Sequence, residues 1–211
     1  MALSPTSEDT VNALWKHIAE LHEEWKVLIE LFGVSQEQSD LLNSSAGAFF
    51  ETVYRTLMRD ILLGISRLTD PLTTVGKDNL VLERLTGLPE VQMAQPLLSS
   101  VSAKLDEVKS LAVPIRDYRN KYLAHLDLGA ALAPSPEVLP GIKRPDVEGV
   151  LLAMADLFNL ISQPLRDTTV VFKDVAIMGG HRALLKCLDD ARVLRSLPFE
   201  QRRQARQRAH G

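Results

Sequence analysis

The chain has 211 residues, of which 45 % are apolar, and a net charge of −3. This composition excludes a disordered chain and a strongly cationic molecule, and no apolar run approaches the roughly 18 residues that a membrane-spanning helix needs. The first five residues also lack the basic and apolar segments of a secretory signal, so we expect a cytoplasmic protein without a membrane partner.

The first predicted helix begins after Ser7, a candidate N-cap, and ends at Gly33. Its apolar residues recur at helical spacing, which predicts one buried face. Trp15 and Trp25 both fall on this face. We therefore expect both indole rings to pack in the core or in a dimer interface rather than to stack on bases.

The second predicted helix opens with Ser35 and Gln38, which form a capping-box pattern. Its predicted buried face includes Phe49, and the helix is expected to end at residues 70–71, where aspartate precedes proline. A turn through Gly76 should lead to a short helix over residues 79–85.

The third long helix is predicted from near residue 90 toward residue 128. Pro114 interrupts it, so we expect a kink there. A loop rich in Ala, Pro and Gly follows, over residues 129–144. Pro145 suits the first turn of a fourth long helix, which should be interrupted or bent near Pro164. Two glycines at 179–180 precede the last helix.

These elements predict an all-α fold with a four-helix-bundle core over residues 7–165 and a C-terminal helical extension over 166–211. The strand signal is negligible. Residues 182–208 contain eight basic and three acidic side chains, a net charge of +5. This basic tail suits contact with nucleic acid or an acidic partner, or a solvated helix.

Cys187 is the single cysteine, so no disulfide can form within the chain. We expect it to be a small buried residue rather than a nucleophile, because no histidine lies at a recognisable spacing. No Cys/His cluster has zinc spacing and no glycine-rich loop suits a phosphate. The sequence therefore predicts neither a metal nor a cofactor.

One segment interrupts the apolar face of the third helix with charge. Apolar residues recur there with steps of four and three: Val101, Leu105, Val108, Ala112 and Ile115. The next two steps reach Arg119 and Tyr122 in place of aliphatic side chains. An unpaired buried charge is very costly. Arg119 therefore needs a carboxylate partner or a polar cleft that binds an anion.

His125 follows on the same third of an ideal helix, about 9 Å further along its axis. One straight helix does not easily bring both side chains to one phosphate. If two copies cross antiparallel near Tyr122, Arg119 of one chain faces His125 of the other, as in an isologous dimer. The cleft between them would suit an anion.

These groups suit cleavage of an RNA phosphodiester. The 2′-hydroxyl is the nucleophile, His125 moves protons at the attacking or leaving oxygen, and Arg119 stabilises charge on phosphorus. DNA lacks the 2′-hydroxyl and would not react.

Structural roles are the alternatives. Arg119 could pair with Asp70 or Asp117 and fasten helices, and His125 could interact with a helix dipole. Asp127 could orient His125 or could be solvated. Arg67, Asp70, Lys77 and Asn79 crowd a helix end, where capping and turn chemistry explain them.

The motif resembles that of the HEPN superfamily, in which Arg is followed by four to six residues and His, often with a polar residue such as Asn120 after the Arg. Residues 116–127 are similar to the abortive-infection U-type HEPN-like family. Residues 66–71 and 76–85 also resemble this family and precede the Arg/His motif in the order expected of its members. The resemblance covers about residues 10–165.

This resemblance implies a four-helix-bundle core, a homodimer, and metal-independent ribonuclease action on RNA in phage defence or a toxin–antitoxin system. Arg119 and His125 take the catalytic positions. We expect RNA contacts from Lys121, Arg67 and Lys77. Four neighbouring residues are expected to support the catalytic pair: Asn120, Tyr122, Arg116 and Asp127. An antitoxin or another protein partner fits the same family.

Two other functions remain open at this stage. Many HEPN proteins are non-catalytic, so the same cleft could bind RNA, a nucleotide or a protein. In some HEPN systems a partner modifies a tyrosine near the motif, and Tyr118 or Tyr122 could be that target.

Overall fold

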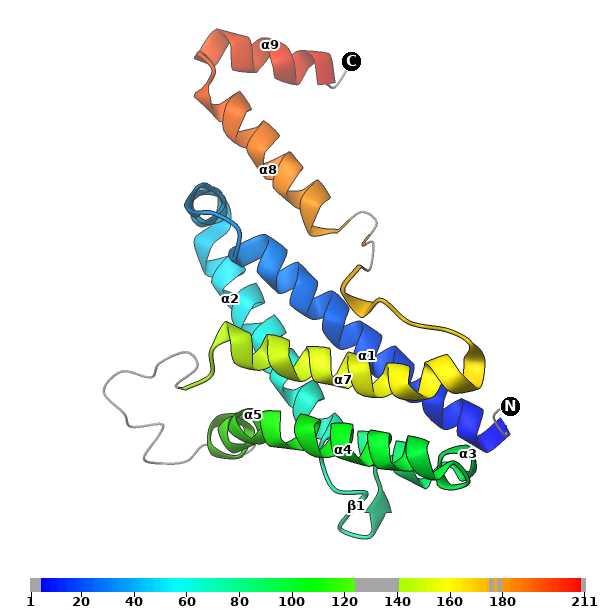
Figure 1. Ribbon diagram of the computed structural model, residues 1–211. Helices are drawn as coiled ribbons and strands as arrows, with labels where there is room; N and C mark the ends of the chain where they lie inside the picture. The colour runs from blue at the N-terminus through cyan, green and yellow to red at the C-terminus, as the bar shows by residue number, and fades with distance from the viewer. Residues whose placement is uncertain (1–4, 124–140, 175–176, 178–179, 210–211) are drawn as a thin grey trace. The chain divides into compact units, whose positions relative to one another are not determined.

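The structure is a computed structural model that describes residues 5–123, 141–174, 177 and 180–209. Within these residues the chain is helical, apart from one small hairpin and the connecting segments (Figure 1). This agrees with the all-α prediction. In the same residues, no helix is long and apolar enough to cross a membrane.

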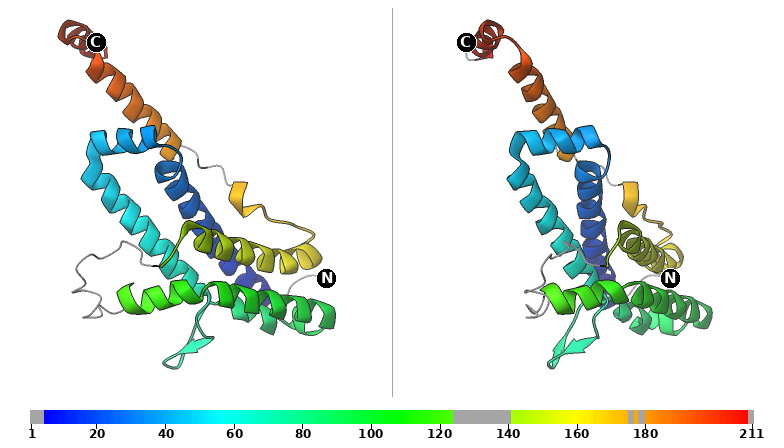
Figure 2. Two further views of the ribbon diagram at one scale, coloured as in Figure 1. Left: turned by 60° about the vertical axis from the view of Figure 1, so that its left-hand side comes forward. Right: turned by 90° about the vertical axis from the view of Figure 1, so that its left-hand side faces the viewer.

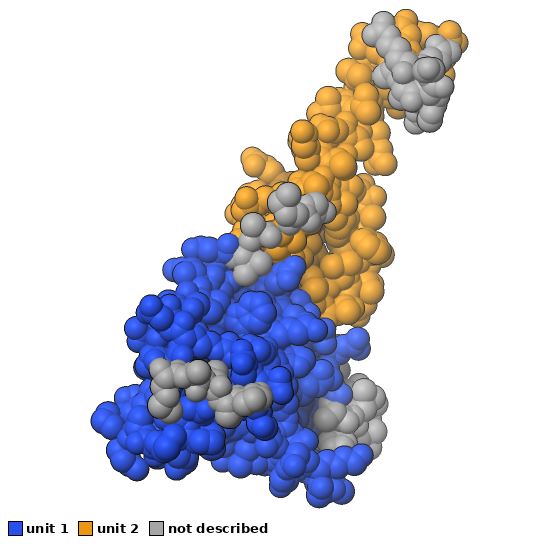
Figure 3. Space-filling model, turned by 90° about the vertical axis from the view of Figure 1, so that its right-hand side faces the viewer, with its two compact units in different colours: residues 1–25, 58–175 blue, residues 26–57, 176–211 orange. Residues whose placement is uncertain are grey.

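The chain divides into two compact units, coloured separately in Figure 3. The first unit contains residues 1–25 and 58–175, and the second contains residues 26–57 and 176–211. The boundary falls inside each of the first two helices, whereas the sequence suggested a division after residue 165. That earlier division, into a bundle and an extension, stays a prediction.

Helix α1 (Pro5–Phe32) starts earlier than the sequence predicted. Ser7 is therefore inside the first turn and is not the N-cap, because a proline fits the first turn of a helix and extends it toward the N-terminus. The Ser7 hydroxyl is buried and donates a hydrogen bond of 3.0 Å to Glu90 of α3 (Pro89–Gln92). This bond ties the start of α1 to a segment 83 residues away.

The end of α1 and the start of α2 (Gln36–Leu68) follow the predicted capping signals. The Gly33 N–H donates to the Ile29 carbonyl at 2.8 Å. The Gln38 N–H donates to the Ser35 hydroxyl at 3.2 Å, which is half of the predicted capping box. The Gln38 side chain instead donates to the Leu31 carbonyl at 2.8 Å, so it caps the end of α1 rather than the start of α2.

Two aromatic residues on predicted buried faces are exposed in the single chain. Trp15 is 45 % exposed, because Leu14 and Ile18 define the buried face and Trp15 lies at its edge. Its packing in a dimer interface stays a prediction. Phe49 is 61 % exposed. It follows a break in α2 at Ala46, where φ is −163° and ψ is 63°, and this break interrupts the helical phase on which the prediction relied. Trp25 is buried, as predicted.

The segment after α2 forms an antiparallel hairpin of β1 (Thr73–Thr74) and β2 (Lys77–Asp78). Its turn residues Val75 and Gly76 both have positive φ, 50° and 73°, as a tight hairpin turn requires. The predicted turn at Gly76 is thus confirmed, but the strands were not expected. The short helix is a 3₁₀ helix, η1 (Leu82–Gly87), which begins three residues later than predicted.

The predicted third helix is broken more than once. After α3 it continues as α4 (Gln95–Leu111) and then as α5 (Val113–Tyr118). The break at Ala112, two residues before Pro114, agrees with the predicted interruption, because a proline cannot donate the hydrogen bond that would continue the helix. Helix α5 follows this single-residue turn and leads directly into the Arg119 segment.

Helix α7 (Arg144–Arg166) lies along α4 (Figures 1 and 2). Proline occupies its first turn, as predicted, and the Lys143 N–H donates to the Asp146 carboxylate at 2.7 Å. Pro164 lies inside the helix, which runs on to Arg166 and ends at Asp167 in the left-handed conformation (φ 50°).

The core of the first unit is apolar and comes from α1, α2, α4 and α7, the four long helices of the predicted bundle. Buried side chains from all four contribute to it: Leu14, Ile18, Ile61, Leu62, Ile65, Val101, Val108, Leu151, Met154 and Phe158. His22 adds a polar link, since its Nε2 lies 3.1 Å from the Leu151 carbonyl of α7, and burial lowers its pKa.

In the second unit, the start of α8 (His181–Ser196) is held by Glu30 of α1. The Arg182 guanidinium donates two hydrogen bonds to the Glu30 carboxylate, at 2.9 and 3.0 Å, and the buried His181 ring contacts the same carboxylate. Hydrogen bonds from Arg182 and then His181 lower the pKa of Glu30 to about 2. Further along α8, Cys187 is exposed, so its predicted burial is wrong.

Replacing Glu30 with glutamine should loosen the start of α8, because the amide cannot accept the charge-assisted bonds of Arg182 and His181. Amide hydrogen exchange over residues 181–196 is expected to become severalfold faster, with residues 144–166 unchanged. The variant Glu51→Gln is a matched control, since Glu51 makes one exposed ion pair with Arg55 at 4.0 Å. Equal exchange in the wild type and Glu30→Gln would show that this carboxylate does not hold α8.

Two carboxyl groups face each other between α1 and α2 in the first unit. Glu24 and Asp60 share a hydrogen bond, which requires a proton between them. Burial, followed by the negative charge of Asp60, raises the pKa of Glu24 to about 7. Glu24 therefore binds a proton in the folded chain at pH values where it is ionised in the unfolded chain.

This shifted pKa predicts a loss of stability between about pH 4.5 and 7, where the folded state holds the proton and the unfolded state releases it. The variant Glu24→Gln stays neutral and should escape that loss. At pH 8 its free energy of unfolding should exceed the wild-type value by about 1 kcal/mol, a modest figure because the pair is partly exposed. Denaturant unfolding at pH 5 and pH 8 measures this difference.

The exposed Asp106 on α4 provides the control, since Asp106→Asn leaves the Glu24–Asp60 contact intact. A Glu24→Gln variant whose advantage does not grow with pH would contradict the shared proton.

Candidate functional site

The segment that carries the predicted motif is not an ordinary α-helix. After α5 the backbone continues as a π-helix over Arg119–Leu123. Such turns have i→i+5 hydrogen bonds, are rare, and occur frequently at functional sites. The predicted α-helical spacing of Arg119 and Tyr122 therefore does not hold here, because a π-turn is wider than an α-turn.

Arg119 is paired with an internal carboxylate. Its Nη1 lies 2.9 Å from Oδ2 of Asp70, and its Nε donates to Oδ1 of Asn120 at 3.2 Å. The Arg119 side chain is 21 % exposed and that of Asp70 is 18 % exposed. The structural alternative for Arg119 is thus realised, with Asp70 rather than Asp117. These two bonds use two of the five guanidinium donors.

A second arginine shares the same carboxylate. Nη2 of Arg116 lies 3.8 Å from Oδ1 of Asp70. Two guanidinium groups around one carboxylate leave a net charge of +1 at this point, so the cluster can still attract an anion. We call Arg116, Arg119 and Asp70 the arginine cluster. Asp70 comes from the segment directly after α2, which links the motif helix to the bundle.

A tyrosine pair lies next to the arginine cluster. The rings of Tyr118 and Tyr122 are stacked, with centroids 4.9 Å apart and an interplanar angle of 28°. Burial and the neighbouring Tyr122 raise the pKa of Tyr118, so the Tyr118 phenol stays protonated at neutral pH. Tyr122 is 36 % exposed and leaves an aromatic surface beside the guanidinium groups.

The other predicted site residues fall in three places. Asn120 and Lys121 are exposed on the π-helix. Arg67 is exposed on α2, and Lys77 is exposed on β2 of the hairpin. Among the contacts described, none joins Lys77 to the arginine cluster. The hairpin itself is held by turn chemistry, since Asn79 donates to the Pro71 carbonyl at 2.8 Å.

His125 and Asp127 lie outside the described residues. The proposed meeting of Arg119 and His125 across a two-fold axis is therefore untested, as are the roles of both residues. What the described residues contain is one half of the predicted site, the arginine cluster with its aromatic neighbours.

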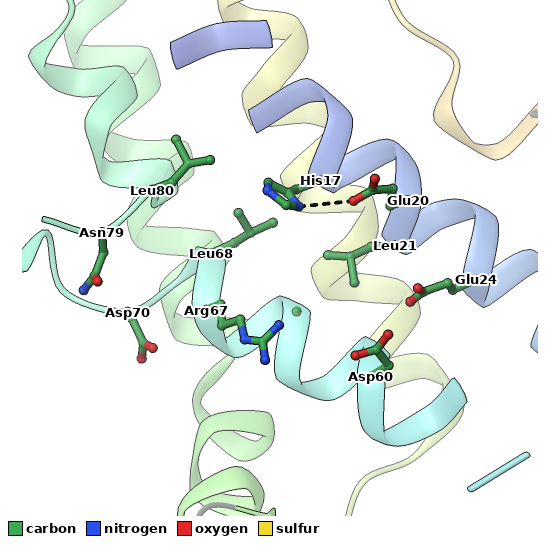
Figure 4. Close-up of a pocket in the computed structure, with 11 residues that line it drawn as sticks. His17, Glu20, Leu21, Glu24, Asp60, Arg67, Leu68, Asp70, Asn79 and Leu80 are labelled. Atoms are coloured by element: carbon green, nitrogen blue, oxygen red, sulfur yellow. Dashed lines mark ion pairs between the residues drawn. The ribbon is translucent and has the colours of Figure 1, made fainter. Parts of the chain in front are cut away.

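A pocket of about 360 Å³ adjoins the arginine cluster and was not predicted from the sequence. It lies between α1, α2 and the segment after α2, and Asp70 belongs both to its lining and to the arginine cluster (Figure 4). The polar lining residues are mostly ionisable and include the Glu24–Asp60 pair: His17, Glu20, Glu24, Asp60, Arg67, Asp70 and Asn79.

The sequence signal for this pocket was present but weak. Glu24 directly precedes the buried Trp25, and Asp60 directly precedes the buried Ile61, so both acids flank core positions. Without the register of α1 against α2, nothing indicated that the two carboxyl groups meet. Within the described residues, no group of three His, Cys, Asp or Glu side chains is placed to hold a metal ion.

The chain matches the model of a known protein family. The family model HEPN_AbiU2, described as AbiU2, matches residues 6–179, which is most of the chain. No curated protein matches the chain, and no solved structure matches it. Both the all-helical fold and the match agree with the resemblance of the three sequence segments. The chain therefore belongs to the HEPN_AbiU2 family of abortive-infection HEPN-like domains.

Proposed function

We propose that this protein is a metal-independent endoribonuclease that acts as a homodimer in the cytoplasm, in phage defence or a toxin–antitoxin system. The observation that carries the proposal is the arginine cluster at the family's motif: two guanidinium groups share one carboxylate and keep a net positive charge. The surplus charge suits a phosphate.

The proposed reaction needs no group outside the chain and the RNA. His125 removes the proton of the ribose 2′-hydroxyl, and the 2′-oxygen attacks the adjacent phosphorus. Arg119 donates hydrogen bonds to the phosphoryl oxygens as negative charge builds there. The bond to the 5′-oxygen breaks, and an imidazolium returns a proton to that oxygen. The products are a 2′,3′-cyclic phosphate and a 5′-hydroxyl end.

The homodimer is part of the proposal because a site shared between two copies would combine Arg119 of one chain with His125 of the other. Asp70 holds Arg119 on the bundle, so Arg119 is already positioned before RNA binds. Tyr122 is partly exposed at the point where two copies would cross. In an antiparallel crossing, each phosphate would meet Arg119 of one subunit and His125 of the other.

A non-catalytic binding module is the second candidate. The bond between Arg119 and Asp70 favours it, because a guanidinium fixed by a carboxylate serves structure as well as anion binding. Such a module would bind RNA or a partner protein through the same surface without cleaving RNA.

The first test replaces the two motif residues separately. His125→Ala should reduce RNA cleavage about 10²–10⁴-fold through loss of proton transfer, and Arg119→Ala should reduce it about 10²–10³-fold through loss of charge stabilisation. Cleavage of cellular RNA by the purified chain, without added metal and with chelator, measures both. Arg55→Ala is the control, because Arg55 makes only an exposed pair with Glu51 and should leave cleavage unchanged.

Mixing the two inactive variants tests the shared site. If each site combines Arg119 of one subunit with His125 of the other, a mixed dimer regains one intact site, and the mixture should recover about a quarter of wild-type activity. No recovery after subunit exchange would contradict the composite site. A clean wild-type dimer that binds RNA but never cleaves it would favour the non-catalytic module.

The role of Asp70 gives a separate prediction. Asp70→Asn removes one negative charge beside two arginines, so RNA binding should tighten at low salt and weaken more steeply as salt rises. Cleavage should nevertheless fall about tenfold or more, because Arg119 loses the group that orients it. Filter binding over a salt series and initial cleavage rates measure the two effects. Asp78→Asn, which breaks the exposed Asp78–Arg84 pair, should change neither.

A further inference from the structure

The pocket beside the arginine cluster offers a different chemistry from the cluster itself. Whereas the cluster is cationic, the wall of the pocket away from Asp70 carries the paired carboxyl groups of Glu24 and Asp60 (Figure 4). The proton that these groups share is used between them, so their remaining oxygen lone pairs can only accept hydrogen bonds. This wall therefore suits a ligand that presents N–H donors.

Other lining groups restrict the ligand further. Arg67 is exposed on α2 between Asp60 and Asp70 in the sequence and provides N–H donors. His17 of α1 offers a half-exposed ring, and an exposed imidazole can stack on a nucleobase. Apolar side chains also line the pocket: Leu21, Leu68 and Leu80. A volume of about 360 Å³ is at the low end for ligand pockets and fits one base rather than a peptide.

Among the four RNA bases, guanine matches this arrangement. Its Watson–Crick edge has two adjacent donors, N1–H and N2–H₂, which a carboxylate accepts together. Its O6 and N7 atoms accept hydrogen bonds, and arginine is their usual donor. Adenine presents an N–H₂ donor where guanine has O6, so it would face the Arg67 donors with another donor.

We propose that this pocket binds the guanine base of an RNA nucleotide next to the phosphate held by Arg119, with Asp60 accepting from N1–H and N2–H₂ and Arg67 donating to O6 and N7. This inference rests on the proposed ribonuclease function for its RNA context. Asp70 connects the two parts, because it lines the pocket and also binds Arg119 at 2.9 Å.

The first experiment measures binding without cleavage. The full chain is titrated with guanosine, inosine and adenosine 5′-monophosphates. The guanine nucleotide should bind, the inosine nucleotide, which lacks the 2-amino group, should bind about tenfold more weakly or worse, and the adenine nucleotide weakest of the three. Asp60→Asn should weaken guanine binding about tenfold or more, because the amide replaces an acceptor with a donor. The exposed Asp106→Asn variant on α4 is the matched control and should bind as the wild type does.

Arg67→Gln provides a second variant if Asp60→Asn does not fold, as judged by circular dichroism. It should reduce the preference for guanine over adenine while the chain stays folded, because Arg67 is exposed at the pocket rim. Equal binding of the guanine and adenine nucleotides by the wild type would overturn the proposal.

The second experiment uses RNA. Oligonucleotides that differ only by G or A next to a single cleavable phosphate are compared, and the wild type should cleave the G substrate preferentially. In Asp60→Asn the ratio of the two rates should approach one. Cleavage that ignores the base, together with selective binding of the free guanine nucleotide, would overturn the RNA assignment and identify a free nucleotide as the ligand.

The two proposals fail in different ways. Selective guanine binding without any RNA cleavage would leave the pocket assignment standing and remove the ribonuclease. Cleavage without any base preference or nucleotide binding would remove the pocket assignment and leave the ribonuclease standing.

Discussion

The bond between Asp70 and Arg119 links the start of the motif region to the bundle. A guanidinium on an apolar helix face cannot stay unpaired, and in this chain the carboxylate that satisfies it comes from the segment directly after α2, 49 residues earlier. The pairing ties the π-helix to that segment. Because Arg116 shares the carboxylate, the cluster also keeps one surplus positive charge. Structural fastening and anion binding are therefore properties of the same three side chains.

Pro114 and the π-turn both serve this arrangement. A continuous α-helix from Gln95 onward would place Arg119 by a regular 3.6-residue repeat. A one-residue turn at Ala112 separates α4 from α5, and the π-helix over Arg119–Leu123 then changes the helical phase. The stacked Tyr118–Tyr122 pair fits this widened turn, since residues four apart on one helix face are neighbours. The irregular backbone thus occurs where the helical apolar repeat of this segment ends.

Local signals predicted the fold well where short-range chemistry decides the outcome. Gly33, Gly76 and the proline in the first turn of α7 all mark the boundaries that the structure has. The signals failed where a competing local or distant group decides. Ser7 is a good N-cap residue, but the helix starts before it and its hydroxyl binds Glu90. Phe49 follows the periodicity of α2, but the break at Ala46 turns it to solvent.

The candidate site was predictable to a similar degree. Arg119 stood out because it breaks an apolar pattern, and Asp70 could be named as one of two partners, although the choice between Asp70 and Asp117 needed three-dimensional structure. The pocket was not predicted, because its sequence signal is weak. Its chemistry depends on the meeting of Glu24 with Asp60, which are on different helices and 36 positions apart, and each alone resembles a solvated helix carboxylate.

The position of Asp70 also explains why a base pocket and a phosphate site can act together. Asp70 touches Arg119 on one side and lines the pocket on the other, so a base in the pocket and a phosphate at the arginine cluster would bind to one rigid corner of the bundle. The two sites have opposite charge, acidic for the N–H donors of a base and basic for a phosphate. A nucleotide has this same division between a base edge and an anionic group, which a free phosphate or a simple cation lacks. The acidic pocket and the basic arginine cluster, which share Asp70, therefore favour a nucleotide-sized ligand over a free phosphate or a simple cation.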